Sequence, residues 1–141
     1  MAKAKDILKD IQSKGYRYSL VREVILDSIM QSHNPLSYFD FYRILSKRKI
    51  SANKATVYRE LAFLTRQKFI CEIQFKDGIK YYEVMEDDHH HHIICNECQA
   101  VGHVNLKRDL DAEEKAIAKN NKFKVLTHSL AFYGLCQKCQ L

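Results

Sequence analysis

The fold depends on the stretch His89-His90-His91-His92-Ile93-Ile94-Cys95-Asn96-Glu97-Cys98 and on its counterpart Cys136-Gln137-Lys138-Cys139. Each Cys-x-x-Cys pair can present two thiolates to one ion, and two such pairs complete a tetrahedral zinc shell. The 37 residues between the two pairs must then fold back so that the pairs meet. In zinc-finger peptides such binding contributes about 10 kcal/mol or more of folding free energy. The spacing therefore predicts a structural zinc site at Cys95, Cys98, Cys136 and Cys139.

The four histidines directly precede the first cysteine pair. If the segment is extended, side chains alternate, which places His89 and His91 on one side and His90 and His92 on the other. Two imidazoles on each side indicate two separate metal sites, each of which needs further ligands. Imidazole and carboxylate ligands suit Fe²⁺, Zn²⁺, Mn²⁺, Co²⁺ or Ni²⁺. Candidate further ligands near predicted breaks or element ends are His33, Glu83, His103, Asp111 and His128.

These patterns have simpler interpretations as well. A Cys-x-x-Cys pair can be a redox-active dithiol, but that motif belongs in a βαβ setting, which is not apparent here. A histidine run can be a solvated polar linker, and each further ligand candidate can be an ordinary surface group. Cys71 stands alone in an expected strand and is best interpreted as a small buried apolar residue. Zinc remains the favoured explanation of the four paired cysteines.

Charge divides the chain of 141 residues, whose net charge is +6. Residues 1–86 hold 16 Lys and Arg against 10 Asp and Glu, an excess of +6, whereas residues 87–141 hold 7 of each. This asymmetry is expected if the first part alone meets a polyanion such as nucleic acid. There is no uninterrupted apolar stretch long enough to cross a membrane and no signal-peptide pattern. We therefore expect a cytoplasmic protein, in which paired cysteines are better explained by metal than by disulfides.

Helical periodicity dominates the first 70 residues. We expect one helix over residues 3–14 with Gly15 after it, and a second helix capped by Ser19. A third helix follows the break at Pro35 and begins at Ser37, and a fourth spans about 54–67, with Ser51 or Asn53 as its cap. From residue 69 the period shifts toward two, and a turn at 76–78 predicts a hairpin of residues 69–75 and 79–84.

Helices followed by a hairpin are typical of a winged helix-turn-helix, in which the last helix enters the major groove of DNA. A small helical domain with no nucleic-acid role would show the same pattern but would leave the positive charge unexplained. We therefore expect a winged-helix DNA-binding domain at residues 1–85. Residues 86–92 have the polar composition of a hinge. Beyond it we expect a strand with a metal knuckle at 93–104, a helix at 107–121 and one or two strands at 124–135.

Three stretches together resemble the ferric uptake regulator (Fur) family of bacterial metal-dependent repressors. The first runs from Ala55 to Arg59 with Leu61 in the fourth helix, and the second is the histidine and cysteine stretch at 89–98. The third runs from His128 to Cys139. Their order and separation match over about residues 5–140. The resemblance implies an α+β protein with an N-terminal winged helix and a C-terminal α/β dimerisation and metal-binding domain at 93–141 that holds the Cys₄ zinc.

The resemblance also implies a homodimer or tetramer that binds palindromic operator DNA and no membrane. Its DNA-contacting positions correspond to Arg17, Arg22, Lys54, Thr56, Tyr58 and Arg59. Of these, Arg17 would enter the minor groove, Tyr58 would touch bases and Arg59 would contact phosphate. Arg22 would be structural or directed to phosphate. The regulatory metal set corresponds to His33, Glu83, His90, His92 and His103, and the second set to His89, His91, Asp111 and His128.

The chain departs from the family pattern at several positions. Gln99 replaces the glycine that commonly follows the second cysteine, and Asp111 replaces the usual Glu with a shorter side chain. His33 stands two residues before the usual histidine position. Zinc-sensing members often carry a cysteine where this chain has Met85, whereas Glu83 resembles iron and peroxide sensors. The resemblance therefore favours Fe²⁺ over Zn²⁺ at the regulatory site, with Mn²⁺ as a surrogate.

The resulting hypothesis is a repressor that is not an enzyme, senses ferrous iron and controls metal-uptake genes. Zinc-uptake and peroxide-sensing regulators of the same family are the related alternatives. A zinc-dependent hydrolase is an alternative of another class, but the chain has no His-Glu-x-x-His helix. A metal-buffering protein is a further alternative, and it would leave the charge asymmetry and the Tyr58-Arg59 helix without a use.

Overall fold

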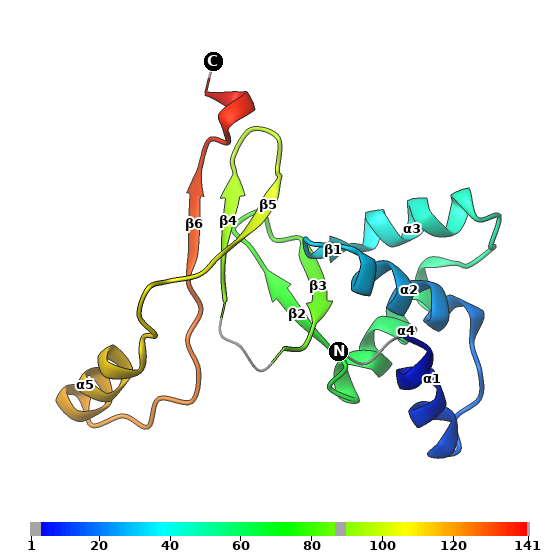
Figure 1. Ribbon diagram of the computed structural model, residues 1–141, viewed down its shortest axis with the longest axis horizontal. Coiled ribbons are helices and arrows are strands. Elements are labelled where there is room, and N and C mark those ends of the chain that lie inside the picture. The colour runs from blue at the N-terminus through cyan, green and yellow to red at the C-terminus, as the bar shows by residue number, and fades with distance from the viewer. Residues whose placement is uncertain (1–3, 87–89, 141) are drawn as a thin grey trace. The chain divides into compact units, whose positions relative to one another are not determined.

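The computed structural model describes residues 4–86 and 90–140. The chain forms two compact units, Met1–Met85 and Glu86–Leu141. Each unit contains one small sheet, and the elements of both are labelled in Figure 1. His89 of the predicted second metal set lies outside the described residues.

The first unit contains four helices, each close to its predicted position. Ser19 caps α2, since its side chain accepts a hydrogen bond from the Arg22 amide, and Ser37 caps α3. Asn53 rather than Ser51 caps α4, where its Oδ1 accepts from the Thr56 amide at 2.8 Å. The bounds are α1 (Ala4–Ser13), α2 (Leu20–Gln31), α3 (Tyr38–Lys47) and α4 (Lys54–Arg66).

The core of the first unit is apolar and is supplied by all four helices. Ile25, Val57, Leu61 and Leu64 are fully buried, and Phe41 is almost fully buried. On α4, Val57, Leu61 and Leu64 recur at intervals of four and three residues, which places them on the inward face of that helix. The pattern that predicted the helices is therefore also the pattern that builds the core.

A three-stranded antiparallel sheet closes the first unit in the order β1-β3-β2. The hairpin of β2 (Ile70–Gln74) and β3 (Lys80–Val84) confirms the predicted wing. Strand β1 (Leu36–Ser37) was not predicted, because two residues carry no periodicity of their own. Its pairing of Leu36 with Tyr82 and of Ser37 with Tyr81 anchors the start of α3 to the wing.

The second unit is built on a sheet of order β5-β4-β6. Strand β4 pairs antiparallel with β5 and parallel with β6, and the parallel register places Cys95 opposite Gly134. Because β4 and β6 run in the same direction, their carboxyl ends lie at the same end of the sheet. The bounds are β4 (His91–Cys95), β5 (Val101–Val104) and β6 (Ala131–Gly134).

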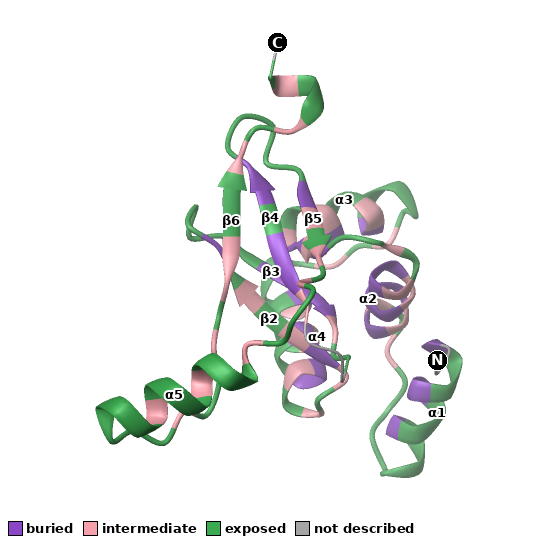
Figure 2. Cartoon of the chain, turned by 60° about the vertical axis from the view of Figure 1, so that its left-hand side comes forward, coloured by how far each residue is buried: buried purple, intermediate pink, exposed green. Residues whose placement is uncertain are grey.

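Two expectations for the second unit were wrong in extent. Helix α5 (Asp111–Asn121) begins four residues later than predicted, and the expected strand at 124–135 is confined to β6. None of the described α5 residues is buried, as the exposed and intermediate colours of this helix show in Figure 2. Its apolar residues therefore find no core within the unit, which explains why periodicity located the start of the helix poorly.

Within residues 4–86 and 90–140, there is no helix with both the length and the hydrophobicity needed to cross a membrane.

Candidate metal centres and nucleic-acid interface

Four cysteine sulfurs converge at the end of the sheet where β4 and β6 finish. The thiol sulfurs of Cys95, Cys98, Cys136 and Cys139 all lie within 4.8 Å of one another. The parallel pairing of β4 with β6 continues into a hydrogen bond from the Asn96 amide to the Gly134 carbonyl at 2.8 Å. The predicted return of the chain between the two pairs is therefore made by this strand pairing.

The geometry of the quartet fits a tetrahedral zinc ion. With Zn–S bonds near 2.3 Å, the sulfurs of a regular tetrahedron are about 3.8 Å apart. The sulfurs of Cys98 and Cys136, from different pairs, are 3.8 Å apart. Each pair forms a tight turn, since the Gln99 amide donates to the Cys95 carbonyl and the Cys139 amide to the Cys136 carbonyl.

Local hydrogen bonds prepare this cluster for a cation. The backbone amide of Cys136 donates to the Cys95 sulfur at 3.3 Å, and this bond is the main cause that lowers the Cys95 pKa to about 6. The pKa of Cys136 is also lowered, chiefly by a hydrogen bond from the Cys139 thiol. That same bond is the main cause that raises the pKa of Cys139 to about 12. Four crowded sulfurs cannot all ionise unless a cation balances their charge.

Three histidines form a second cluster on the same sheet. His92 on β4 lies directly opposite His103 on β5, and His90 precedes β4. The ring centres of His90 and His103 are 4.6 Å apart, and those of His92 and His103 are 5.4 Å apart. One ring nitrogen of each histidine lies within 4.8 Å of the others, so the three can share one ion. The three histidines, all of them predicted regulatory ligands, therefore lie together in one cluster.

The first unit contains the other two predicted regulatory ligands. Glu83 is a buried residue of β3, and the Cys71 sulfur of the paired strand lies 3.9 Å from its carboxylate. His33 is exposed in the connection that follows α2. Their relation to the histidine cluster stays a prediction.

The second histidine set contains a residue that the sequence did not identify. The buried His91 lies 5.4 Å from His128 between ring centres. The carboxylate paired with His128 Nδ1, at 2.5 Å, belongs to Glu114. The predicted Asp111 is an exposed residue at the start of α5, one helical turn before Glu114. Asp111, Glu113 and Glu114 all lie in the first turn of α5, so their position in the helix does not decide which of them pairs with His128.

Helix α4 presents most of the predicted DNA-contacting residues. Lys54, Tyr58 and Arg59 are exposed, and Thr56 is intermediate. Asn53 Oδ1 accepts hydrogen bonds from both the amide and the hydroxyl of Thr56. The Arg59 guanidinium in turn donates to Thr56 Oγ1 at 3.3 Å. The cap that starts the helix therefore also begins a chain of contacts that orients Arg59.

Arg22, for which the resemblance implies either a structural role or a phosphate contact, is buried. Arg22 is 8% exposed, and its Nε donates to the Glu60 carboxylate at 2.8 Å. Its guanidinium carbon lies 4.1 Å from the ring centre of Phe63, and Nη1 donates to the Arg17 carbonyl at 3.0 Å. Arg22 thus ties α2 to α4 and fixes the backbone at Arg17, which itself is exposed.

A groove of about 440 Å³ lies beside this ion pair on α4. Arg59 and Arg66 are seven residues apart, which places them on the same helical face two turns from each other. Because Arg22 and Glu60 neutralise each other, Arg59 and Arg66 leave the groove positive. Arg66 was not assigned from the sequence, although its spacing from Arg59 is a usable signal. The groove is lined by Arg22, Thr56, Arg59, Glu60, Ala62, Phe63 and Arg66.

Comparison with known proteins identifies the family of this chain. Residues 13–133 match the model of the Ferric uptake regulator family. The chain belongs to this family. Its members are metal-dependent DNA-binding regulators of transcription, and the fold class predicted from the sequence is confirmed.

Individual relatives cover nearly the whole chain. The Ferric uptake regulation protein of Bacillus subtilis is 33% identical over 137 residues, which cover 94% of this chain and 91% of the relative. The Helicobacter pylori ferric uptake regulator Fur, whose structure reveals three functional metal binding sites, is 25% identical. It matches with a TM-score of 0.79 over 99% of this chain and 95% of its own. A zinc-bound manganese uptake regulator, also 25% identical, matches with a TM-score of 0.73 over 96% and 99%.

Proposed function

We propose that this chain is a cytoplasmic repressor that senses ferrous iron and controls metal-uptake genes. The observation that carries the proposal is the cluster of His90, His92 and His103 in a chain that also presents a basic recognition helix. Zn²⁺ is the structural ion of the four cysteines. Fe²⁺ is the regulatory ion, with Mn²⁺ as its surrogate. The proposed activity is regulation, and no residue is assigned a catalytic role.

The regulatory ligand set comprises His33, Glu83 and the histidine cluster. When bound, the metal supplies positive charge and coordination geometry that this mixed imidazole and carboxylate set satisfies. His33 and Glu83 belong to the winged-helix unit, whereas the cluster belongs to the unit with the zinc cysteines. Shared coordination would favour one arrangement of the two units, and coupling of this kind is typically worth about 1–3 kcal/mol. We further propose that His91, His128 and Glu114 hold a second ion, with Glu114 in place of Asp111.

The DNA-contacting residues are those that α4 and the segment before α2 expose. Tyr58 would touch base edges in the major groove, while Arg59, Lys54, Thr56 and Arg66 would contact phosphate. Arg17 would enter the minor groove, held in place by the hydrogen bond from buried Arg22 to its carbonyl. The proposed partner is a palindromic operator, because a twofold dimer presents two such helices.

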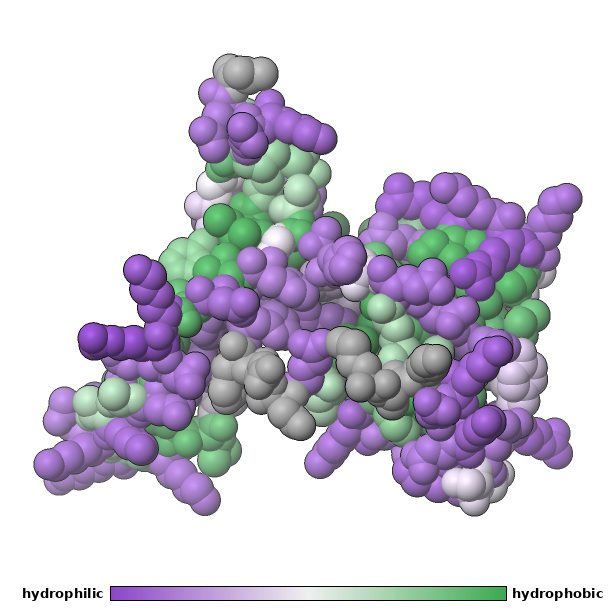
Figure 3. All heavy atoms as spheres, viewed as in Figure 1, coloured by the Kyte–Doolittle hydropathy of each residue, from purple (hydrophilic) through white to green (hydrophobic). Residues whose placement is uncertain are grey.

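The exposed apolar residues of the second unit support a homodimer. Phe123 is 73% exposed and Leu126 is 82% exposed, and Ile117, Phe132 and Leu135 are also exposed. Figure 3 shows apolar surface over the strands of this unit and beside α5. Contiguous exposed apolar patches usually mark interaction sites. We therefore expect Leu126→Ser to weaken dimerisation in analytical ultracentrifugation, whereas Lys119→Ser on exposed α5 serves as the control.

A zinc-responsive regulator is the second candidate, and one contact favours it. The Cys71 sulfur lies 3.9 Å from the Glu83 carboxylate, and a thiolate is a soft ligand that suits Zn²⁺ better than Fe²⁺. If zinc is the signal, Cys71→Ser should weaken the zinc response more than the Mn²⁺ response. An equal effect on both metals would remove this argument for zinc.

The experiment that tests the proposal is fluorescence anisotropy on operator DNA with zinc retained at the cysteines. The probe is a duplex that the metal-loaded protein selects from a randomised pool. Fe²⁺ under anaerobic conditions, Mn²⁺ and Zn²⁺ are titrated at buffered free concentrations. Tight binding that appears with Fe²⁺ or Mn²⁺ supports the iron repressor, and a response at far lower free Zn²⁺ supports the zinc alternative.

Two further measurements, on a DNA-contact variant and after peroxide treatment, distinguish the candidate functions. Arg59→Ala should abolish operator binding and leave metal binding unchanged, whereas Lys119→Ala, which removes the same charge from α5, should change neither. Loss of binding after peroxide treatment with Fe²⁺, but not with Mn²⁺, would identify a peroxide sensor. DNA binding that no metal affects would overturn the regulatory mechanism.

A further inference from the structure

The exposed ring of Tyr58 is held by a second tyrosine from another helix. Tyr58 on α4 is 38% exposed, and its ring stacks on that of Tyr38, the first residue of α3. The ring centres are 4.8 Å apart and the planes differ by 3°. The Lys54 ammonium lies 5.8 Å from both ring centres, a distance suited to cation–π attraction. Tyr58 therefore has a defined neighbour on one face although it remains open to solvent.

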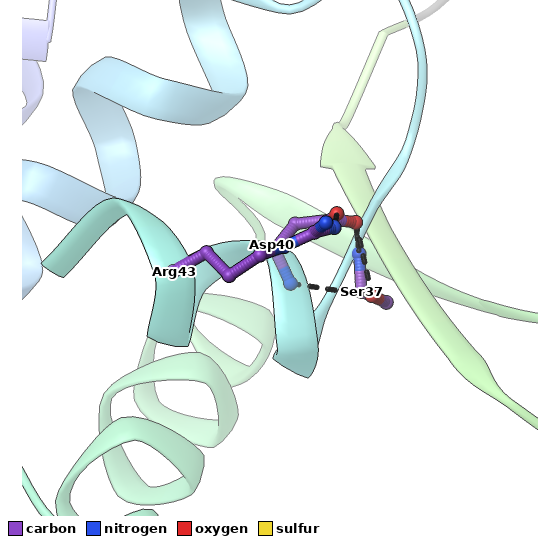
Figure 4. Close-up of polar contacts among 3 residues, drawn as sticks. All are labelled: Ser37, Asp40 and Arg43. Carbon is purple, nitrogen blue, oxygen red and sulfur yellow. Dashed lines mark hydrogen bonds and ion pairs between the residues drawn. The ribbon is translucent and has the colours of Figure 1, made fainter. Parts of the chain in front are cut away.

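The position of Tyr38 is itself fixed by the local structure. Ser37 and Asp40 form a capping box, in which the Ser37 amide and hydroxyl both donate to Asp40 Oδ2 at 2.8 and 2.9 Å. Arg43 pairs with the other carboxylate oxygen of Asp40 (Figure 4). Ser37 also pairs with Tyr81 through β1. The backbone just before Tyr38 is therefore held from both the helix and the sheet.

A stacked ring can reduce the entropy that a side chain loses when it binds DNA. An exposed tyrosine samples several rotamers, and immobilising a side chain on binding is a recurrent cost of association. Burial, followed by the nearby Tyr58 and Tyr42, raises the pKa of the Tyr38 phenol above its ordinary value. Parallel aromatic pairs with centres at this distance are favourable beyond their buried area. The stack thus restrains the ring of Tyr58 before DNA is present.

We propose that Tyr38 is a positioning residue that orients Tyr58 for contact with bases in the major groove. The inference rests on the proposed DNA-binding function and extends it to a residue on α3. Tyr38 would act through Tyr58 rather than through a DNA contact of its own. Because the interaction concerns a base-contacting ring, it would raise affinity for the operator more than affinity for unrelated DNA.

A double-mutant cycle tests this inference. The proteins compared are the metal-loaded wild type, Tyr38→Leu, Tyr58→Ala and the double variant, each measured on the selected duplex and on a scrambled duplex. Tyr38→Leu should weaken operator binding roughly three- to tenfold, in the range that immobilising a side chain supports. In the Tyr58→Ala background the same change should have almost no effect, since the residue through which it acts is gone.

Control variants separate positioning from folding and from direct contact. Tyr38→Phe keeps the ring and should restore wild-type affinity. Phe39→Leu removes a neighbouring exposed ring, which meets Tyr38 edge-on, and should leave binding unchanged. The salt dependence of operator binding should be unchanged in Tyr38→Leu, since no phosphate contact is lost. Thermal unfolding and zinc content verify that each variant is folded.

Two outcomes would overturn the inference. Additive losses in the double variant would show that Tyr38 acts independently of Tyr58, and an unchanged affinity of Tyr38→Leu would show that the stack has no function in binding. If the wild type itself selects no duplex, the failure belongs to the proposed function and not to the positioning of Tyr58.

Discussion

The two units of this protein are stabilised by different means. The first has an apolar core in which Ile25, Leu61 and Leu64 are fully buried. Among the described residues of the second unit, the buried hydrophobic ones are Ile94, Cys95 and Val101, accompanied by the buried His91 and His92. The first unit is thus stabilised by buried apolar side chains, and the second by side chains that bind metal. A small unit with little core commonly needs such a metal.

The largest expected effect comes from the zinc ligands. Cys98→Ser should unfold the second unit, because binding of a structural zinc contributes about 10 kcal/mol or more. The first unit should keep its fold, since its core contains none of these ligands. Hydrogen exchange measured by mass spectrometry should show protection lost at residues 91–134 and retained in α2 and α4.

Cys71→Ser is the matched control for this prediction, since it changes the same atom outside the quartet. It should leave zinc content at one ion per chain for the structural site and leave exchange in the second unit unchanged. Retained protection of β4 and β6 in zinc-free Cys98→Ser protein would contradict the comparison between the units.

The next effect concerns the apolar core of the first unit. Leu61→Ala should lower the free energy of unfolding by about 2–5 kcal/mol, the usual range when a buried leucine leaves a cavity. Leu61 is fully buried on α4. Chemical denaturation monitored by circular dichroism measures the loss, and a chelator-based zinc assay should show unchanged zinc content. Ala62→Gly on the exposed side of the same helix should cost only about 1 kcal/mol.

The same contrast explains which parts of the fold could be predicted from sequence. The helices and the wing of residues 4–84 were predicted correctly, because the apolar residues that recur with helical or strand periodicity are the same residues that pack in the core. Helix α5 and the segment before β6 have apolar residues such as Leu126 that lie exposed, so the pattern lacks the core that would define the ends. Strand β1 was missed because its pairing with β3 depends on tertiary structure alone.

The candidate sites divide in a similar way. The cysteine quartet could be predicted because two short motifs determine the ligands without knowledge of the path between them. Glu114 could not, because it shares the first turn of α5 with Asp111, and its pairing with His128 depends on tertiary structure. Arg22 was assigned from its position in the family pattern, and sequence could not show that Glu60 and Phe63 would enclose its guanidinium.

A smaller effect is expected at the start of α3. Ser37→Ala removes the side chain that caps the helix and accepts from the Asp40 amide, and such losses cost about 0.5–2 kcal/mol. The loss should appear in the unfolding of the first unit and leave zinc content unchanged. Ser46→Ala, at an exposed position of the same helix, is the control. Equal effects of the two substitutions would show that the capping box contributes little.

The smallest effect should come from Gln99, which closes the first cysteine turn in a left-handed conformation with φ of 61°. For a residue with a β-carbon this conformation costs roughly 1–2 kcal/mol, whereas glycine adopts it readily. Gln99→Gly removes this strain but increases the entropy of the unfolded chain, which offsets about 0.5–1 kcal/mol of the gain. Glycine also loses the hydrogen bond from the Gln99 side chain, so we expect a net stabilisation of at most about 1 kcal/mol, measured as slower loss of zinc to a chelator.

Gln99→Ala separates the backbone effect from the side-chain hydrogen bond. Alanine keeps the β-carbon and its strain but removes the bond from Gln99 Nε2 to the Asn96 carbonyl, which is 3.0 Å long. Zinc loss should therefore be faster in Gln99→Ala than in the wild type and slower in Gln99→Gly. If glycine also accelerates zinc loss, the hydrogen bond outweighs the strain, and the turn is held by its side chain. In that case even the loop of the metal-dependent unit would owe its stability to a contact within the chain rather than to the ion.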